Sequence, residues 1–453
     1  MELAKIAERA VEAATAAGAG DAEAYVQDSV GREIRVFDGE VESLTDAGQR
    51  GLGVRCWIDH RSGYAYGTDL TEDGLRDIAA SAVEAARVAD PDEFAAAPAP
   101  ADGAVPEIPE LVDSTVADWN TERKVELAQA IERAARAADD RIVAVETTVY
   151  ADEEQRVALA SSAGLSGAWE ATTAFAYLQA IAESDGDKQT GLGFGMGRSP
   201  QALDAEEIGR EGAERATSLL GAAKPDSRTC PVVLDPIVAA SFVGVIGGTL
   251  CADAVQRGRS PFAGKLGEEV GSAALTLTDD AIDPAGLNSS PLDDEGSPRG
   301  RTPLIGAGTL AAYLHDSYTA RRQGNGTRTT ANASRSGYRS PPGVSTSNLI
   351  VAPGEKSFEE LLAEAEGGVY VTDVAGLHSG VNPVSGTFSV GATGRLISGG
   401  ALADAADEFT IASDLASMLK AVAAAGSQAR WVPFGGSVSA PPLLIAEMAI
   451  GGA

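Results

Sequence analysis

The first 225 residues contain the same order of elements twice, and this repeat limits the possible folds more than any other feature of the sequence. Apolar residues recur at helical spacing over residues 3–14, and segments of alternating apolar and polar residues follow over residues 22–70. A second predicted helix covers residues 71–88. Residues 121–220 then repeat the order of helix, alternating strands and helix. We therefore expect a duplicated α+β unit built on antiparallel strands.

Residues 226–453 differ in character, because short predicted strands alternate with loops rich in Gly, Ser and Asn. Two short helices, near residues 358–364 and 414–424, interrupt these strands. The expected fold class is α+β, with an N-terminal α/β domain of residues 1–225 that contains antiparallel sheets. A β-rich, barrel-like C-terminal domain of residues 226–453 follows it. Within the first domain, about residues 90–113 are rich in Pro, Ala and acidic side chains and are expected to form a linker or surface loop.

The chain is strongly acidic. It has 35 Lys and Arg residues against 66 Asp and Glu residues, a formal net charge of −31, and no segment rich in Lys or Arg. This balance repels phosphate backbones and anionic lipid surfaces, so we expect neither a nucleic acid nor a membrane as partner. Hydrophobic residues make up 44% of the chain, which is typical of a folded protein with a large core.

The cysteines and the N-terminal segment favour a cytoplasmic location. Cys56, Cys230 and Cys251 lie far apart in apolar segments, as buried thiols of a reducing compartment do. The N-terminal segment MELAKIAERAVEAATAAG carries acidic side chains early and no uninterrupted apolar run, unlike a signal peptide. The longest apolar run, residues 236–250, is broken by Ser and Gly and is shorter than a bilayer span.

A glycine-rich helix is predicted directly after Asp235. This aspartate is followed by proline, which is typical of a helix start because the carboxylate caps the helix and proline fits its first turn. The segment SFVGVIGGTLCADAVQRGRSPF (241–262) then places Gly244, Gly247 and Gly248 inside the helix. Three such glycines cost on the order of 2 to 3 kcal/mol relative to alanine. Close approach of a neighbouring helix or of a bound chain would account for this cost.

The sequence contains few histidines and cysteines, the residues that most often bind catalytic zinc or act as a thiol nucleophile. The three histidines, His60, His315 and His378, are far apart, whereas helical zinc motifs place two histidines within one or two turns. A zinc site assembled from all three through the fold remains the alternative to local hydrogen bonding and, for His60, to exposure in a hairpin turn. Cys251 ends an apolar helix and is expected to be a buried, inert thiol rather than a nucleophile.

Two further segments admit both a functional and a structural interpretation. GLGFGMG (191–197) is dense in glycine, but it does not join a strand to a helix ahead of an acidic residue. Flexibility or close packing is therefore favoured over phosphate binding. DDEGSPRGRT (293–302) places three acidic residues beside two arginines. It forms either a site for a hard cation or a loop whose charges pair with one another, and the loop is favoured.

Five segments resemble the TldD/PmbA family, and in particular its PmbA branch, which is also called TldE. They span about residues 30–400 and keep the order of the family. The segments are EIRVFDGEVESLTDAGQRGLGVRCWIDHRSGYAYGTDL, YADEEQRVALASSAGLSG, AVQRGRSPFAGKLGEEV, DDEGSPRGRTPLIGAGTLAAYLHDSYTARR and GLHSGVNPVSGTFSVGATGRLISGG. An older label for the family is modulator of DNA gyrase.

The resemblance implies that the metal site of the family is missing from this chain. In the TldD branch, H-E-x-x-x-H ahead of an RGSS-like turn binds zinc together with a later cysteine. Counting back from the turn that begins at Arg257 puts the two histidines and the glutamate of this motif on Val243, Gly248 and Gly244. The segment FGGSVSAPPLLIAEMAIGG has no cysteine. The resemblance thus implies no catalytic residue, no metal ligand and no cofactor in this chain, with zinc held by a TldD-like partner.

The resemblance also implies a heterodimer in which the two subunits have different tasks. The TldD-like subunit would hydrolyse peptides, and this chain would complete the cavity and help to present an extended peptide by strand pairing. The residues expected to line that peptide cavity are Gly247, Arg257, Ser260, Gly380 and Asn382. Contacts that merely order the loops are the alternative for Arg257, Ser260, Gly380 and Asn382.

Two other functions stay open from the sequence. One is a peptidase or amidase of specialised biosynthesis that acts as a homodimer with an unusual metal or with none, so that the chain would be an enzyme by itself. The other is a binding protein that modulates DNA gyrase. The net charge of −31 disfavours direct contact with DNA but allows docking on a basic protein.

Overall fold

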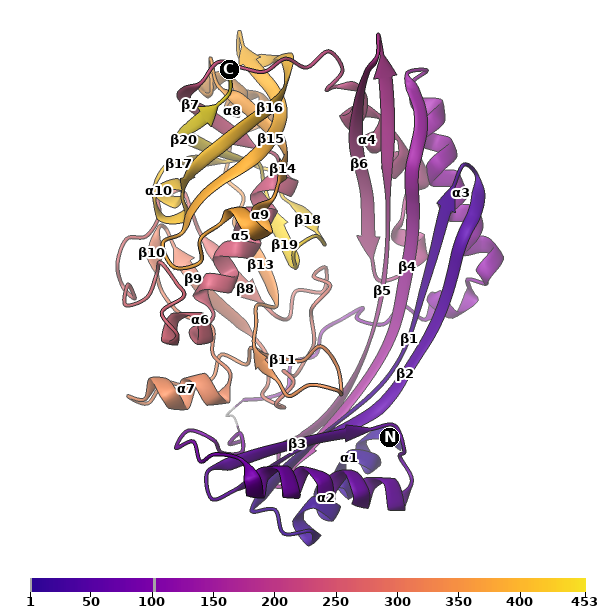
Figure 1. Cartoon of the computed structure of the whole chain (residues 1–453), viewed down its shortest axis with the longest axis vertical. Helices are drawn as coiled ribbons and strands as arrows, with labels where there is room; N and C mark the ends of the chain where they lie inside the picture. The colour runs from indigo at the N-terminus through magenta and orange to yellow at the C-terminus, as the bar shows by residue number, and fades with distance from the viewer. Residues whose placement is uncertain (1, 101–102) are drawn as a thin grey trace.

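One antiparallel sheet of six strands forms the centre of the N-terminal half (Figure 1). The computed structural model describes residues 2–100 and 103–453. The strand order is β3–β2–β1–β4–β5–β6, so the two predicted α+β units each contribute three strands and join through β1 and β4. The strands are β1 (Asp21–Phe37), β2 (Glu40–Ile58), β3 (Arg61–Gly67), β4 (Ile142–Ser161), β5 (Ser166–Ser184) and β6 (Asp187–Gly197). The predicted repeat is present, and it builds a single continuous sheet.

Two pairs of helices cover one face of this sheet. They are α1 (Glu2–Ala16), α2 (Glu72–Val88), α3 (Thr121–Ala138) and α4 (Ala205–Thr217). The first pair packs around Ala24 of β1 and the second pair around Ile34, which points to the same face near the other end of the strand. Because side chains alternate along a strand, Glu23 and Tyr25 point to the opposite face. That opposite face is directed at the C-terminal half.

The glycine-dense segment 191–197 lies where α4 crosses β6. A Cβ atom at Gly191 would collide with Gly212 O of α4, and a Cβ atom at Gly193 would collide with Ile208 O. Glycine at these positions lets the helix backbone approach the strand closely. Close packing, which the sequence favoured over phosphate binding, therefore explains the segment.

The predicted linker of about residues 90–113 runs along the surface of the C-terminal half. Arg321 donates from Nε to Phe94 O at 2.8 Å and from Nη2 to Ala96 O at 2.8 Å. Residues 101 and 102 lie outside the described residues. A short 3-10 helix, Ser114–Asp118, then leads to α3.

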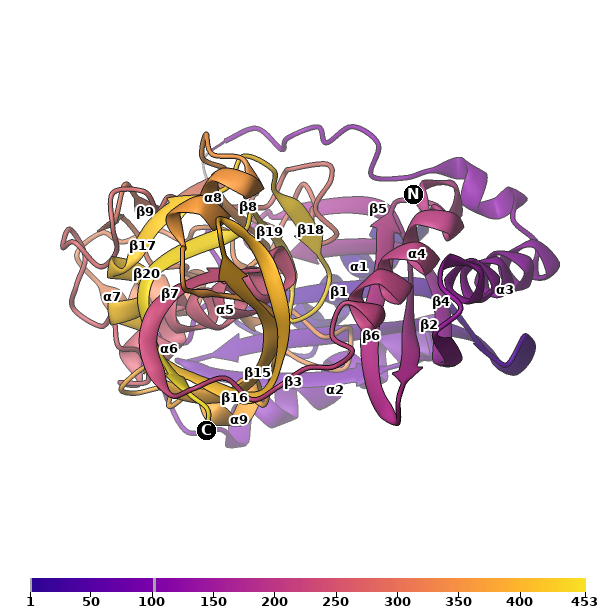
Figure 2. The ribbon, with the colours of Figure 1, turned by 90° about the horizontal axis from the view of Figure 1, so that it is seen from above.

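Five strands of the C-terminal half close into a barrel (Figure 2). β16 pairs with β15 on one side and with β20 on the other, while β14 and β7 complete the ring. The strands are β7 (Arg228–Leu234), β14 (Val369–Ala375), β15 (Thr387–Ser398), β16 (Ala401–Asp414) and β20 (Leu443–Gly451). A further strand, β17 (Val422–Ala425), pairs with β20. The β-rich, barrel-like C-terminal half is confirmed.

A second six-stranded sheet accompanies the barrel, in the order β10–β9–β8–β13–β19–β18. Its strands are β8 (Leu277–Asp280), β9 (Arg301–Gly306), β10 (Thr309–Leu310), β13 (Asn348–Val351), β18 (Arg430–Val432) and β19 (Ser437–Ala440). A separate short pair consists of β11 (Ala333–Ser334) and β12 (Gly343–Val344).

The short helices of the C-terminal half are α6 (Ala252–Gln256), α7 (Ser317–Gln323), α8 (Phe358–Glu364), α9 (Leu377–Gly380) and α10 (Leu415–Lys420). In the N-terminal half, the 3-10 helix Pro200–Ala202 lies between β6 and α4.

The sequence predictions were wrong at some boundaries of this half. The helix predicted over residues 414–424 ends at Lys420, because the chain turns into β17 at Val422. α7 was not predicted, since a seven-residue helix is too short to show a clear period. Among the described residues, no helix combines the length and the apolar character that crossing a bilayer requires.

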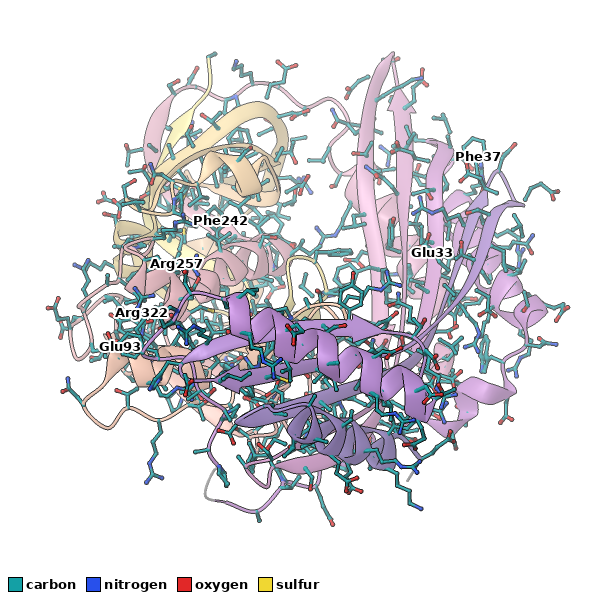
Figure 3. All side chains as sticks on the ribbon, turned by 60° about the horizontal axis from the view of Figure 1, so that its bottom comes forward. Glu33, Phe37, Glu93, Phe242, Arg257 and Arg322 are labelled. Carbon is teal, nitrogen blue, oxygen red and sulfur yellow. The ribbon has the colours of Figure 1, made fainter. Side chains whose placement is uncertain are left out.

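α5 (Pro236–Leu250) is buried between the barrel and the second sheet. The predicted cap is confirmed, because an Asp235 carboxylate oxygen accepts a hydrogen bond from Ile237 N at 2.9 Å. Apolar side chains occupy nearly its whole circumference, as expected of a helix inside a core. Phe242, labelled in Figure 3, packs against Phe388 with ring centroids 5.0 Å apart.

Buried ion pairs join the sheet to the C-terminal half. Arg55 of β2 donates to Glu23 of β1 at 2.8 Å and to Glu295 at 2.8 Å, and both carboxylates are buried. Arg335 also binds Glu23, and its guanidinium lies 4.9 Å from the ring centroid of Tyr25. In segment 293–302, Asp293 and Glu295 are buried, and Glu295 pairs with Arg55 of β2 and not with an arginine of its own segment. The favoured interpretation of this segment, a solvated loop whose charges pair with one another, was therefore wrong.

Removing Arg55 should destabilise the protein strongly. In Arg55→Met, Glu295 loses its cation while it remains buried, and we expect the free energy of unfolding in urea to fall by about 3 to 5 kcal/mol. The control is Arg210→Met, which removes an exposed pair with Glu207 and Glu214 and should cost less than about 1 kcal/mol. Equal losses in the two variants would contradict this assignment.

Stability should also depend on the protonation of Asp293. Burial, together with the charge of Glu295, raises the pKa of Asp293 to about 7. The folded chain therefore holds this proton more tightly than the unfolded chain, in which aspartate titrates near about 4. The contribution of Asp293 to the free energy of unfolding therefore decreases as the pH rises from about 4 to about 7. The decrease is at most about 1.4 kcal/mol per pH unit.

Asp293→Asn removes this titration and serves as the test. The quantity to compare is the free energy of unfolding of the wild type minus that of the variant. This difference should decrease as the pH is raised from about 4.5 to about 7.5. A difference that stays constant over this range would show that Asp293 has an ordinary pKa in the folded protein.

Candidate functional site

α5 has one narrow face that is not buried. Over residues 241–250, this face consists of Ser241, Gly244, Val245 and Gly248. Gly244 and Gly248 lie about one turn apart and so share the face. A Cβ atom at Gly248 would meet no heavy atom within 4 Å, whereas one at Gly244 would lie 3.0 Å from Gly435 O. This face, here called the open strip, is open at Gly248 and close to Gly435 O at Gly244, and its two glycines offer no side-chain donor or acceptor. The hydroxyl of Ser241 donates to Ile237 O of the same helix at 2.8 Å.

Gly247 has a different environment. It is buried, and a Cβ atom at this position would collide with Leu349 Cδ1 of β13 and lie 3.0 Å from Thr346 Cγ2. The second sheet therefore approaches the helix backbone at this point. Glycine at 247 is explained by packing between elements of this chain.

The donors required for a zinc ion are missing from this part of α5. Val243 is 3% exposed and belongs to the hydrophobic core, and Gly244 and Gly248 carry no side chain. Cys251 at the end of the helix is a buried thiol, and burial raises its pKa to about 12, so it stays protonated near neutral pH. Zinc ligands are thiolates, neutral imidazoles and carboxylates. The residues present on α5 do not fit the metal.

The histidines do not supply the missing ligands. His60 is exposed in the turn between β2 and β3, as predicted. His315 is buried, and burial lowers the pKa of its imidazole. The side chain of His378 lies outside the described residues. Within the described part of the chain, no group of three or more His, Cys, Asp and Glu side chains is arranged to hold a metal ion.

A cavity of about 390 Å³ lies beside α5, between the sheet and the loops of the C-terminal half. From the sheet side it is lined by Tyr25 and Trp169, and from the other side by Asn288, Arg335 and Thr346. Thr346 also lies 3.0 Å from the position of a Cβ atom at Gly247, on the buried side of α5, and no described residue of α5 itself lines the cavity. Aromatic rings, amides, hydroxyls, the two arginine side chains Arg299 and Arg335 and the two carboxylates Glu153 and Asp294 meet in this space.

The cavity contains functional candidates that the sequence did not reveal. Tyr25, Trp169 and Arg335 come from β1, β5 and the segment after β11, which are more than 100 residues apart. No local spacing links such residues. The available signal was the alternation in β1, which predicts that Tyr25 lies on the face opposite to Ala24.

Arg257 and Ser260 lie in the loop after α6. Arg257 is exposed, pairs with Asp253 at 2.7 Å and lines a separate cavity of about 340 Å³ that includes Trp57 and Tyr318 (Figure 3). Ser260 is 7% exposed, and its Oγ accepts a hydrogen bond from Phe262 N at 3.1 Å. The contact made by Ser260 orders the loop, which was the alternative interpretation.

Gly380 ends α9, and Asn382 lies in the loop that follows it and ends at Gly386. Asn382 Oδ1 accepts hydrogen bonds from Val384 N at 2.9 Å and Ser385 N at 3.1 Å, so this side chain shapes its own turn. A Cβ atom at Gly380 would lie 2.9 Å from Val390 Cγ1. A Cβ atom at Gly386 would lie 3.2 Å from Pro261 Cγ. The structure thus brings this loop next to the loop of Ser260.

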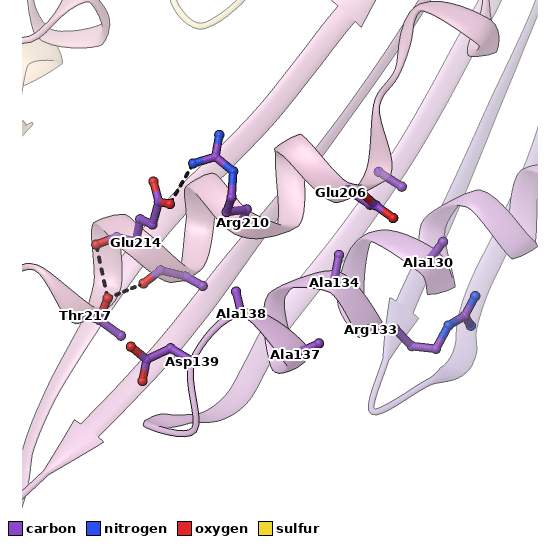
Figure 4. Close-up of a pocket in the computed structure, with 12 residues that line it drawn as sticks. Ala130, Arg133, Ala134, Ala137, Ala138, Asp139, Glu206, Arg210, Glu214 and Thr217 are labelled. Atoms are coloured by element: carbon purple, nitrogen blue, oxygen red, sulfur yellow. Dashed lines mark hydrogen bonds and ion pairs between the residues drawn. The ribbon is translucent and has the colours of Figure 1, made fainter.

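A cavity of about 620 Å³ lies far from α5, on the outer side of the sheet between α3 and α4 (Figure 4). Alanine side chains such as Ala134 and Ala138 line it. Arg210 at its edge is paired with Glu214 on the same helix. Few polar groups converge there, so its size alone does not make it a functional site.

The different environments of the glycines can be tested by adding one methyl group. Gly248→Ala should raise the free energy of unfolding by about 1 kcal/mol, because alanine favours the helix and its Cβ enters open space. Gly247→Ala should instead lower it by about 1 to 3 kcal/mol, because its Cβ collides with Leu349. Urea denaturation of both variants measures these changes, and an equal effect at the two positions would contradict the packing described.

Comparisons with known proteins agree with the fold and with the sequence motifs. Three models of the PmbA/TldA metallopeptidase family match the chain: domain 1 over residues 22–86, the central domain over 115–220 and the C-terminal domain over 227–452. The metalloprotease PmbA of Escherichia coli O157:H7 is 28% identical over 452 residues, which cover 99% of this chain and 96% of that protein.

Solved structures agree in fold over almost the whole chain. A Thermotoga maritima protein described as a proposed modulator of a DNA gyrase superposes with a TM-score of 0.89 at 27% identity, with 99% of each chain covered. TldE of Thermococcus kodakarensis superposes with a TM-score of 0.90 at 22% identity, covering 98% of this chain and 99% of that one, and shows the same fold. The chain belongs to the TldD/PmbA family.

Proposed function

We propose that this chain is the TldE/PmbA-like subunit of a TldD/TldE-type metallopeptidase complex. It completes the peptide-binding cavity, while a TldD-like partner supplies zinc and hydrolyses the peptide. The observation that carries this proposal is that the buried Val243 and the glycines Gly244 and Gly248 occupy the positions of the family's zinc motif on α5 without a single metal donor.

Zinc hydrolysis needs a fixed set of groups that α5 does not offer. A catalytic zinc ion takes three protein ligands and keeps one position for water, and a nearby base accepts the proton of that water. At neutral pH the thiol of Cys251 stays protonated, and it lies inside the core. In the proposed complex, these groups all belong to the partner.

The cavity beside α5 suits an extended peptide. A peptide backbone presents N–H and C=O groups in alternation, and both need partners when they leave water. Hydroxyl and amide groups that can serve as partners line the cavity at Gln155, Asn288, Ser289 and Ser345. Trp169 offers an aromatic surface for an apolar side chain of the peptide. The groups lining this cavity can bind and orient a peptide without cleaving it.

Reconstitution with a TldD-like chain that carries H-E-x-x-x-H tests this division of tasks. Each chain alone and the two together would be assayed for bound zinc by mass spectrometry and for cleavage of an unstructured peptide. We expect copurification as a heterodimer, zinc only in the partner, and cleavage only by the combination. Chelator-sensitive cleavage by this chain alone would instead establish the homodimeric enzyme. A stable complex with gyrase, without peptide cleavage in any combination, would establish the binding protein.

The open strip on α5 gives a second, residue-level test. Gly248→Leu fills the space that the glycine leaves and should lower the rate of peptide cleavage by the reconstituted complex by about tenfold or more. Association of the two subunits should not change. The matched control is Gly306→Leu, another glycine with nothing within 4 Å of its Cβ position. Full activity of Gly248→Leu would contradict a role of this strip in the peptide cavity.

A further inference from the structure

A second polar cavity lies on the C-terminal half and shares Arg299 with the cavity beside α5. It has a volume of about 520 Å³ and is formed by residues 297–302, α7 and residues 327–331. Four arginines line it: Arg299, Arg301, Arg321 and Arg328. None of the described residues that line it is an aspartate or a glutamate. In a chain with a net charge of −31, such a concentration of positive charge is unexpected.

Two of these arginines bind carbonyl groups instead of carboxylates. Arg321 donates to carbonyl oxygens of the linker, including Phe94 O and Ala96 O at 2.8 Å. Arg299 donates to Asn288 O at 3.1 Å and to Ala333 O at 3.3 Å. Neither arginine forms an ion pair with any described residue. Carbonyl oxygens fix the position of a guanidinium but leave its full charge in place.

Arg301 and the hydroxyl groups add further donors. Arg301 is exposed, and its one ion pair among the described residues, with Asp280, is long at 3.8 Å. Arg299 Nε is buried without a hydrogen-bond partner among the described residues. Hydroxyl groups of Thr302 and Thr327 lie on the same wall. Donors from three separate segments therefore converge on one cavity.

Two carboxylates that interact electrostatically with Arg299 already accept hydrogen bonds from backbone N–H groups. Asp293 and Asp294 interact electrostatically with Arg299, but they lie inside the protein. Asp293 Oδ1 accepts hydrogen bonds from Glu295 N and Ser297 N, and Asp294 Oδ2 accepts one from Arg335 N. Their carboxyl groups are thus occupied by backbone donors, and none of the described residues that line the cavity carries a carboxylate.

We propose that this cavity binds a phosphate group of a small ligand. A phosphate group offers at least three acceptor oxygens in three dimensions, and it is recognised by arginine forks combined with hydroxyl donors. The cavity volume is that of a small-molecule site. The acidic surface of the rest of the chain repels a long polyanion, which restricts the ligand to one that the cavity encloses.

Calorimetric titration of the full chain tests this site with inorganic phosphate, pyrophosphate and citrate at constant ionic strength. Wild type should bind phosphate and pyrophosphate saturably, with pyrophosphate binding more tightly because it engages more arginines. Arg301→Gln should weaken pyrophosphate binding by about tenfold, since it removes one charge-assisted contact. Arg301 is exposed, so this variant should keep the thermal midpoint of the wild type, and the midpoint is measured alongside.

Arg322→Gln is the matched control. Arg322 is the next residue on α7, is exposed and does not line the cavity (Figure 3). This variant removes the same charge and should change pyrophosphate affinity by no more than about twofold. Absence of saturable binding of both phosphates overturns the proposal, and so does tighter binding of citrate than of pyrophosphate. Equal weakening in Arg301→Gln and Arg322→Gln also overturns it, because it would indicate attraction by general charge instead of a site.

Discussion

The buried ion pairs between the sheet and the C-terminal half are the constraint on which the candidate site depends. Arg335 binds Glu23, stacks on Tyr25 and lines the cavity beside α5, so one side chain fixes both walls of this space. A buried charge that loses its partner is costly, which means that the two halves cannot slide past each other without breaking these pairs. The cavity is therefore a fixed feature of the fold and needs no ligand to form.

The repeat of helix, strands and helix was predictable because alternation, helical spacing and capping residues are local signals. The caps at Thr71, Asp204 and Asp235 each accept a hydrogen bond from a backbone N–H, as such residues do at helix starts. The pairing of β1 with β4 joins the two repeats. It was not predictable, because the two strands are about 120 residues apart and no local signal links them. Closure of the barrel depends in the same way on pairing between β16 and β20.

In the candidate site, too, local features were predictable from the sequence and long-range contacts were not. Absence of metal donors at Val243, Gly244 and Gly248 is visible in the sequence once the motif is aligned. The three glycines look equivalent in the sequence, but the structure separates them: Gly247 is pressed against Leu349, and Gly248 faces open space. The convergence of Tyr25, Trp169 and Arg335 has no local signature at all. The sequence therefore predicted the residue types present on α5 and missed most of the residues that line the cavity.

A helix with one exposed and one half-buried glycine on the same face is tolerated here because its other faces are so well packed. Each glycine costs about 1 kcal/mol relative to alanine, whereas burying one large apolar side chain contributes about 1.5 to 3 kcal/mol. Phe242, Ile246 and Leu250 are each almost fully buried, so their packing exceeds the cost of the glycines. The packed faces of α5 thus stabilise the helix, while Gly244 and Gly248 carry no side chains that would fill the space beside it.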